Sequence, residues 1–535
     1  MNDKNNETHQ YDSCSAKGIC SVEPRTSSLQ EVLITYLKLL AFYSIELKKF
    51  GGQNNDVQKI ILNTISTLMN KLETANEQFN QSLINLKTIL SETKKTYLEV
   101  CKENNYSPKD ISNNIKLEDK IDLTELIKEG SKEFNSRIES LSKETKDLFE
   151  IVLFVVKSLA INTIELQEYS ENNNIINEAY ENILTLLNLL NDNNEEISNI
   201  IDTIKSGAKI NSKIEKEINK EKVERFGEPE KTEVSISTRN NNAILVTGNN
   251  LIDLENLLEF TKDKNIDIYT NGELIVAHTY PKFKKYPNLI GHYGKGKESC
   301  LLDFSSFKGA ILITKHSVEN IDYLYRGRLF TTDSFVPNGA SKIINNDYTT
   351  LIEAAYNSKN FKDEDKGIKI QVGYSQEEIN EKLSHIIREK EKYQHIVFIC
   401  KDNHNDKNKN YFKNLLKNMP ENTLAITFYI HKDCKNCINL KGIVDYNMIY
   451  PIIDKLQEIF IGLQYDISIF ISKCDKHTVS KIISFREHGI KDIYLSMCTP
   501  IILNPNLIET LKKHFWIRTA EQPLNDIKTI SENLT

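Results

Sequence analysis

Apolar residues recur at helical spacing through the first part of the chain, from Ser28 to about Val223. Ser28 and Glu31 form a capping box, which predicts the start of the first long helix, and Gly51-Gly52 predicts its end. The apolar face of this helix is formed by Leu29, Leu33, Tyr36, Leu40, Tyr43 and Leu47. A helix with such a face buries it against other helices, so the pattern predicts a helical bundle.

Three further helical stretches follow in the same region. One long stretch carries Ile61, Ile65, Leu68, Leu72 and Phe79 on a single face, and the others cover residues 141–168 and 175–190. Because packing alone explains these stripes, we interpret them as bundle core rather than as a cofactor site.

The period of the apolar residues changes after a polar segment, residues 217–242, which we interpret as an interdomain linker. Short apolar runs then alternate with helical stretches, as in parallel β/α units whose sheet is covered on both faces. The predicted strands cover residues 243–246, 266–269, 310–313, 396–399, 424–429 and 467–471. A second boundary is predicted between Gly367 and Lys390, where a charged helix precedes the strand near His395.

The predicted fold class is therefore α plus α/β. At 535 residues the chain is long enough for roughly three domains. We predict a helical-bundle domain over residues 1–225 and two Rossmann-like parallel-sheet domains over residues 226–380 and 381–535. Ligands of such sheets bind at the loops beyond the carboxyl ends of the strands, so candidate functional residues are sought there.

Composition excludes several classes of function. Acidic residues exceed basic ones, 75 against 68, and the two signs are interspersed, which does not indicate a nucleic-acid binder. The longest apolar run, residues 151–156, is too short to span a bilayer, and residues 1–12 lack the apolar core of a signal peptide. Nine scattered cysteines suit a reducing compartment. We expect a cytoplasmic protein that binds neither nucleic acid nor membrane.

Two pairs of cysteines could carry chemistry. Cys14 and Cys20 are separated by five residues on a loop ahead of the first helix, where thiolates could hold an iron-sulfur cluster or zinc, although each needs about four ligands. Cys434-Lys-Asn-Cys437 is half of a metal or redox motif, and the sequence has no second half to complete it. Ordinary reduced thiols are the alternative interpretation for both pairs.

Glycine-containing turns do not support a nucleotide site. Val246-Thr-Gly-Asn-Asn250 ends a predicted strand before a helix but has a single glycine. Residues 291–296, Gly-His-Tyr-Gly-Lys-Gly, are richer in glycine, but no convincing strand precedes them.

One longer stretch resembles a known family. Ile268-Tyr-Thr-Asn-Gly-Glu-Leu-Ile-Val-Ala-His-Thr-Tyr-Pro281, followed by Gly291-His-Tyr-Gly294, is similar to the second domain of hybrid-cluster proteins, the hydroxylamine reductase family. Supporting matches are Lys17-Gly-Ile-Cys20, residues 243–248 and 325–332, Asn410-Tyr-Phe412 and Gly489-Ile-Lys491. The chain is therefore identified as resembling this family along its length.

The resemblance implies a helical domain followed by two Rossmann-like domains, with an iron-sulfur-oxygen hybrid cluster where the three meet. It also implies a [4Fe-4S] or [2Fe-2S] cluster near the N-terminus. The family reduces hydroxylamine to ammonia and water, and some members reduce nitric oxide, with electrons from a redox donor entering through the N-terminal cluster.

Most of the implied cluster ligands are replaced in this sequence. Cys14 and Cys20 match the last two of four N-terminal cysteines. At the hybrid cluster Glu273 is retained, whereas the family's cysteine positions fall on His316, Asp402, Ile430 and Tyr446. The other ligand positions fall on Asn249, Asp475 and His477, and Cys400 lies two residues from Asp402. Because Ile430 and Tyr446 cannot supply anionic sulfur, we expect the family activity to be impaired or lost.

Three hypotheses remain open at this point. The cluster could assemble with displaced ligands and support hydroxylamine reduction. Its substitute thiols would be Cys400, the least implausible, or Cys434, Cys437 and Cys474. The set Glu273, His316, Asp402, Asp475 and His477 could instead hold another divalent metal, such as zinc or manganese, through nitrogen and oxygen. The third hypothesis is a pseudoenzyme, a non-catalytic descendant retained for interaction or regulation, which needs only the apolar pattern of the fold.

Overall fold

The computed structural model describes most of the chain. The described residues are 24–52, 55–69, 77–109, 123–170, 174–294, 300–315, 327–333, 336, 339–361, 367–387, 389–400, 406–428, 436–440, 448–471, 478–495 and 505–532.

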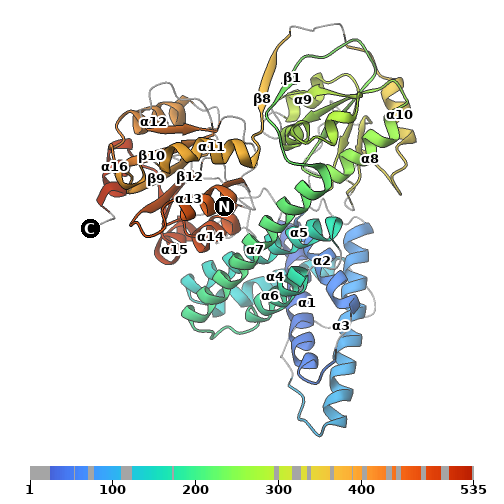
Figure 1. Ribbon diagram of the computed structural model, residues 1–535. Coiled ribbons are helices and arrows are strands. Elements are labelled where there is room, and N and C mark those ends of the chain that lie inside the picture. Colours follow the sequence, from blue (N-terminus) through green and yellow to red (C-terminus); the bar gives the residue numbers. More distant parts are fainter. Residues whose placement is uncertain are drawn as a thin grey trace, which may run out of the picture.

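The first part of the molecule is helical, and its helices pack side by side (Figure 1). They are α1 (Pro24–Lys48), α2 (Asn55–Met69), α3 (Glu77–Glu103), α4 (Leu123–Ser140), α5 (Lys143–Tyr169), α6 (Asn174–Leu189) and α7 (Ile197–Phe226). Helix α5 begins where the Ser142 hydroxyl accepts a hydrogen bond from the Thr145 backbone. Its apolar residues lie on every side, as expected of a helix enclosed by others.

Three sequence-based details of this region were wrong. Helix α1 begins at Pro24, a residue suited to a first helical turn, so Ser28 lies inside the helix and contacts Ser131 of α4. Phe79 belongs to α3 and not to the preceding helix, because two helices that face one core carry the same apolar period. Residues 217–226 continue α7, since Ile218, Lys222 and Phe226 form a buried stripe at four-residue spacing within a charged segment.

The first sheet has six parallel strands in the order β4-β3-β2-β5-β6-β7. These strands are β2 (Ala243–Thr247), β3 (Asp267–Asn271), β4 (Leu289–His292), β5 (Ala310–Ile313), β6 (Leu329–Thr331) and β7 (Ala340–Lys342). The connections contain α8 (Leu251–Thr261), η1 (Gly272–Thr279), η2 (Phe283–Lys285), α9 (Cys300–Ser306) and, after β7, α10 (Thr349–Tyr356).

The second sheet also has six parallel strands, in the order β11-β10-β9-β12-β13-β14. Its strands are β9 (His395–Ile399), β10 (Thr423–Thr427), β11 (Cys437–Asn439), β12 (Asp466–Ile471), β13 (Asp492–Leu495) and β14 (Ile517–Thr519). Its helical segments are α11 (Gln376–Ile387), η5 (Lys390–Lys392), α12 (Asp406–Lys417), α13 (Ile449–Ile459), α14 (Thr478–Glu487), α15 (Pro505–Phe515) and α16 (Pro523–Glu532). The predicted fold class, α plus α/β with two parallel sheets, is confirmed.

All six predicted strands are present, and the sequence missed mainly short or edge strands. Among these are β4, which contains Gly291 and whose existence corrects the expectation that no strand supports residues 291–296. Also missed were β1 (Thr232–Ser235) and β8 (Lys369–Val372), which pair antiparallel outside both large sheets. Three- and four-residue strands carry too few apolar positions to establish a period.

Helix α7 joins the helical region to both sheets. Helix α14 packs against α7, and the Ser484 hydroxyl donates a hydrogen bond to the Ala208 carbonyl at 3.0 Å. The hydroxyl of Tyr450 donates to Glu215 Oε2 at 2.6 Å, and both residues are buried. At its other end α7 leads through Gly227 into the first α/β region (Figure 1).

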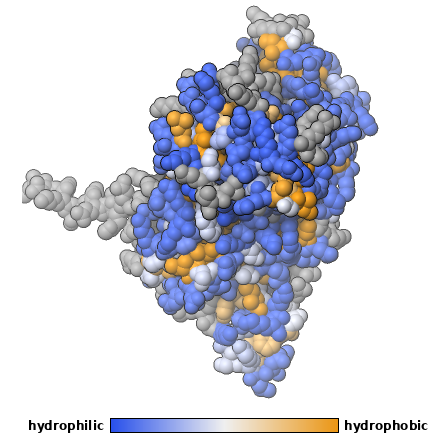
Figure 2. Space-filling view, turned by 60° about the vertical axis from the view of Figure 1, so that its left-hand side comes forward, coloured by the Kyte–Doolittle hydropathy of each residue, from blue (hydrophilic) through white to orange (hydrophobic). Residues whose placement is uncertain are grey.

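The face of the molecule in Figure 2 is mainly hydrophilic, with separate smaller hydrophobic patches. Within the described ranges, none of the helices has the length and apolar character needed to cross a membrane.

Close packing of α1 and α4 gives a test of the helical core. A Cβ at Gly130 would lie 1.9 Å from the Ser28 carbonyl oxygen, so Gly130→Ala forces the two backbones apart. The gain in helix propensity, about 1 kcal/mol, is smaller than a forced backbone shift. We expect a net loss of about 1–2 kcal/mol of stability in chemical denaturation. The exposed Lys132→Ala on the same helix is the control, and equal stability of the two variants would contradict this packing.

Candidate functional site

Two of the family's cluster positions lie in the described part of the chain, Asn249 and Glu273. They follow the adjacent parallel strands β2 and β3, whose carboxyl ends lie at the same edge of the first sheet. Both side chains are exposed. The other predicted positions lie outside the described residues: Cys14, Cys20, His316, Asp402, Ile430, Tyr446, Asp475 and His477.

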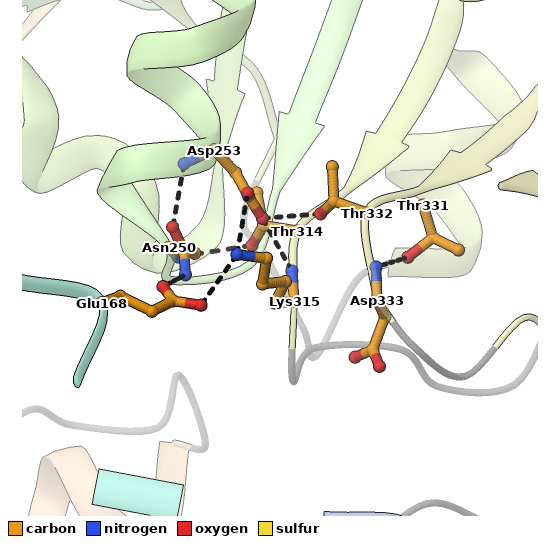
Figure 3. A network of polar contacts seen from close by, with 8 residues as sticks. All are labelled: Glu168, Asn250, Asp253, Thr314, Lys315, Thr331, Thr332 and Asp333. Carbon is orange, nitrogen blue, oxygen red and sulfur yellow. Dashed lines mark hydrogen bonds and ion pairs between the residues drawn. The ribbon is translucent and has the colours of Figure 1, made fainter. Parts of the chain in front are cut away.

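A network of polar side chains occupies the edge of the sheet next to Asn249 (Figure 3). Asn250 caps α8, where its Oδ1 accepts a hydrogen bond from the Asp253 backbone at 2.9 Å. Its Nδ2 donates to Glu168 Oε2 at 2.6 Å, and its backbone N–H donates to the Thr314 hydroxyl at 3.3 Å. Asn250 thus joins the loop after β2 to the loop after β5 and to the end of α5.

Lys315 and Asp253 form the centre of this network. The Nζ of Lys315 lies 2.8 Å from Glu168 Oε1 and 3.7 Å from Asp253 Oδ1. Asp253 Oδ2 accepts hydrogen bonds from the Thr332 hydroxyl at 2.6 Å and from the Lys315 backbone at 3.1 Å. Nearby, the Thr331 hydroxyl accepts a hydrogen bond from the Asp333 backbone at 3.0 Å.

The electrostatics of the network follow from its burial. Burial raises the pKa of Asp253, against the opposing effects of Lys315 and of the hydrogen bond from Thr332. Burial alone would lower the pKa of Lys315, but the charges of Asp253 and Glu168 outweigh it and raise that pKa. The Lys315 ammonium therefore lies near two carboxylates, whose negative charges favour its protonated form.

The network connects separate parts of the fold. Glu168 lies in the last turn of α5, in the helical region, whereas its partners lie in loops of the first sheet. Asn250 follows Asn249 directly, and Lys315 directly precedes His316. The network thus anchors the two loops that carry these family positions. Part of the network could have been found in the sequence, because Asn250 followed by Asp253 is a helix-capping pattern. No local pattern points to Lys315 or Glu168.

The segment that carries the family resemblance contains a buried pair of histidines. The Thr270 hydroxyl lies 2.9 Å from His278 Nε2 and 3.0 Å from His292 Nδ1. A hydroxyl donates one hydrogen bond, so it must accept from one ring if it donates to the other. Burial lowers the pKa of His278 to about 4, against a hydrogen bond with the Gly291 backbone. These polar residues join η1 to β3 and β4.

Cys400, the nearest substitute for a family cysteine, is fully buried at the end of β9. It shares a face of this strand with Ile396 and Phe398, in the core beneath α13 and α14. Burial raises the pKa of its thiol, although Lys481 acts in the opposite direction. A neutral thiol in an apolar core is neither a good nucleophile nor a good metal ligand.

Two further observations concern metal chemistry. Cys437, the second cysteine of the CxxC motif, begins β11 and is disulfide-bonded, so the interpretation of this residue as a reduced thiol was wrong. Cys434 lies outside the described residues. Within the described ranges, no three His, Cys, Asp or Glu side chains are grouped so as to hold a metal ion. The one described member of the predicted nitrogen and oxygen ligand set, Glu273, therefore has no such group around it among these residues.

Comparisons with known sequences agree with the family resemblance of residues 268–294. Residues 9–428 match the model of the Prismane/CO dehydrogenase family. A hydroxylamine reductase of Thermodesulfovibrio yellowstonii is 26% identical over 545 residues, covering 96% of this chain and 97% of that protein. A hydroxylamine reductase of Kosmotoga olearia is also 26% identical, with 97% of each chain covered.

Among solved structures, alpha subunits of acetyl-CoA synthase/carbon monoxide dehydrogenase with NiZn[Fe4S4] and NiNi[Fe4S4] clusters are similar to this chain. The TM-score is 0.45 at 12% identity, with 96% of this chain and 83% of that chain covered. This likeness is too distant to add to the argument from sequence.

Removing the central cation of the network tests its role. Lys315→Met leaves Glu168 and Asp253 as adjacent carboxylates without their cation, so we expect a loss of about 1–3 kcal/mol, less than for a fully buried pair. Thermal and urea denaturation measure it, with the exposed Lys359→Met as control. Adding Glu168→Gln to Lys315→Met should restore part of the loss, and strictly additive effects would contradict the ion pair.

The lowered pKa of His278 predicts how the stability of the protein depends on pH. Its folded-state pKa, about 4, lies below the unfolded value near 6.5, so the unfolded chain binds the extra proton more readily. Stability is therefore lost as pH falls from about 6.5 to 4, by at most about 3 kcal/mol.

The thermal midpoint of His278→Gln should fall less steeply over this range than that of the unmodified protein. Thr270→Val removes the bridging hydroxyl but keeps the imidazole, so it should keep the steep dependence. If the thermal midpoint of His278→Gln and that of the unmodified protein fell equally with pH, the loss of stability could not be assigned to His278.

Proposed function

Since the chain belongs to the Prismane/CO dehydrogenase family, we propose that it is a divergent relative of the hydroxylamine reductases in which hydroxylamine reduction is lost or strongly impaired. In this proposal the chain is a cytoplasmic protein that keeps the family scaffold for interaction or regulation. The domains would follow the limits 1–225, 226–380 and 381–535. Hydroxylamine or nitric oxide and a redox donor would be its partners only if activity remained.

The observation that carries the proposal is the chemistry of the cluster positions. An iron-sulfur centre is held mainly by cysteine thiolates. The positions that the resemblance assigns to cysteine hold an imidazole, a carboxylate, an aliphatic chain and a phenol, namely His316, Asp402, Ile430 and Tyr446. A retained Glu273 supplies one oxygen ligand and cannot replace four sulfurs.

The geometry of the described residues supports the same proposal. Among the thiols near the family positions, Cys437 is disulfide-bonded, Cys434 and Cys474 lie outside the described residues, and Cys400 is the nearest by sequence to a family cysteine position. Its thiol lies in the apolar core with a raised pKa, so it does not suit an iron site. The family cluster does not fit these residues.

The N-terminal cluster is subject to a similar constraint. Cys14 and Cys20 supply two thiolates, and a cluster of either type needs about four protein ligands. Without such a cluster, electrons would lack the entry route that the family resemblance implies. The apolar core and the two sheets do not depend on that chemistry, which is why a scaffold role is compatible with the sequence.

Metal analysis of anaerobically purified protein tests the proposal. We expect iron and acid-labile sulfide well below one cluster per chain and no hydroxylamine-dependent oxidation of reduced methyl viologen. The hydroxylamine reductase of Thermodesulfovibrio yellowstonii, purified in the same way, is the positive control. Stoichiometric iron and sulfide together with dye oxidation would overturn the proposal. A different metal in stoichiometric amount would favour the nitrogen and oxygen ligand set instead.

A further inference from the structure

A cleft lies where α7, η1, the loop before α11 and the start of α13 meet. Its volume is about 430 Å³, within the range of sites that hold small organic molecules. Its lining is mainly apolar and includes Val223, Val276, Tyr280, Tyr374, Met448 and Pro451. The two cluster positions that the structure describes, Asn249 and Glu273, are not among its lining residues.

The walls of the cleft come from distant parts of the sequence and are closely fitted. Along α7 the lining residues recur at three- and four-residue spacing, from Lys216 to Glu224, and so form one face of that helix. Gly373 approaches η1 so closely that a Cβ there would lie 2.5 Å from Thr279 Cγ2. Gly373 also has a φ of +81°, which glycine adopts readily. The backbone at this wall is thus fixed by its packing.

Two lysines and two glutamates line the cleft, Lys216, Lys220, Glu224 and Glu228, and they differ in whether they are paired. Lys216 is paired with Asp454 at 2.7 Å. Lys220 lies 3.1 Å from Glu217 and 3.9 Å from Glu224, so its charge is also balanced. Glu228 makes no ion pair or hydrogen bond with the part of the chain that the structure describes. The rim therefore carries an exposed carboxylate whose charge is not balanced by a neighbouring lysine.

We propose that this cleft binds a small organic amine with an aromatic or other apolar body, whose ammonium group is held by Glu228. The apolar body packs against Val276 and the two tyrosines, Tyr280 and Tyr374, which are mostly buried in the walls. Aromatic walls suit a cation as well as an apolar ring. The site goes beyond the proposed function and does not depend on whether a cluster assembles.

Three probes with the same indole body and different charges test the proposal: tryptamine, the neutral alcohol tryptophol, and the anion indolepropionate. Titrations followed by ligand-observed NMR use the full-length protein. We expect one site per chain and an affinity for tryptamine about two- to fivefold higher than for tryptophol, the size of one exposed charge pair. Indolepropionate should bind most weakly.

Variants locate the binding. Glu228→Gln should reduce the tryptamine affinity to that of tryptophol and leave tryptophol unchanged, whereas Glu353→Gln on α10 should change neither. Val276→Phe fills the cleft and should abolish binding of all three probes. Met448→Trp, on the α13 side of the cleft, is a second filling variant for the case that the first fails to fold. Leu302→Phe, at an exposed site elsewhere, is the control for both.

Two results would overturn the proposal. Equal affinities for tryptamine and tryptophol in the unmodified protein, or an unchanged tryptamine affinity in Glu228→Gln, exclude a cation site. Binding that persists in a folded, cleft-filled variant excludes the cleft itself. Neither result bears on the iron and sulfide content, so the cleft and the loss of reductase activity can fail separately.

Discussion

Burial of α5 is the constraint on which the rest of the structure depends. This helix packs against α2, α6 and α7 in the helical region and against α14 and α15 of the second α/β region. Its last turn also supplies Glu168 to the loops of the first sheet. A helix with apolar residues on every side is stable in water only when it is enclosed, so α5 requires both its bundle and its neighbours.

Polar contacts between the regions determine their relative orientation. Glu215 and Tyr450 join α7 to the second α/β region, and Glu168 and Lys315 join α5 to the first. A buried polar group without its partner is costly, so only arrangements that satisfy these groups are tolerated. Apolar contacts hold the three regions together, and these hydrogen bonds and ion pairs select their relative positions.

The sequence predicted the fold class because long apolar periods are local properties. The six main strands follow from short apolar runs such as residues 310–313 and 396–399, where every residue of the run is buried. The long helices follow from apolar residues at helical spacing. The early start of α1 and the continuation of α7 were missed because proline and charged residues are tolerated at helix starts and on half-buried helices. Strands such as β6 and β7 were too short to show a period.

The candidate site was predicted less completely. Asn249 and Glu273 could be placed at the carboxyl ends of strands because the strands themselves were evident. The partnership of Glu168 with Lys315 spans 147 positions in the sequence, and no local pattern reveals which distant charges will meet. Cys400 looked like a possible ligand from its position alone. Its burial depends on how α13 and α14 cover the sheet, which only the three-dimensional arrangement reveals.

The pairing of β1 with β8 has a consequence for how the chain is organised. The chain enters the first α/β region along β1 and leaves along β8, with Val234 directly opposite Ile370. The entry and exit points are therefore neighbours, and the segment between them has its two ends side by side. Such a layout is that of a module inserted into a host, so residues 236–368 could be exchanged or excised with a short bridge while the host keeps its own connectivity.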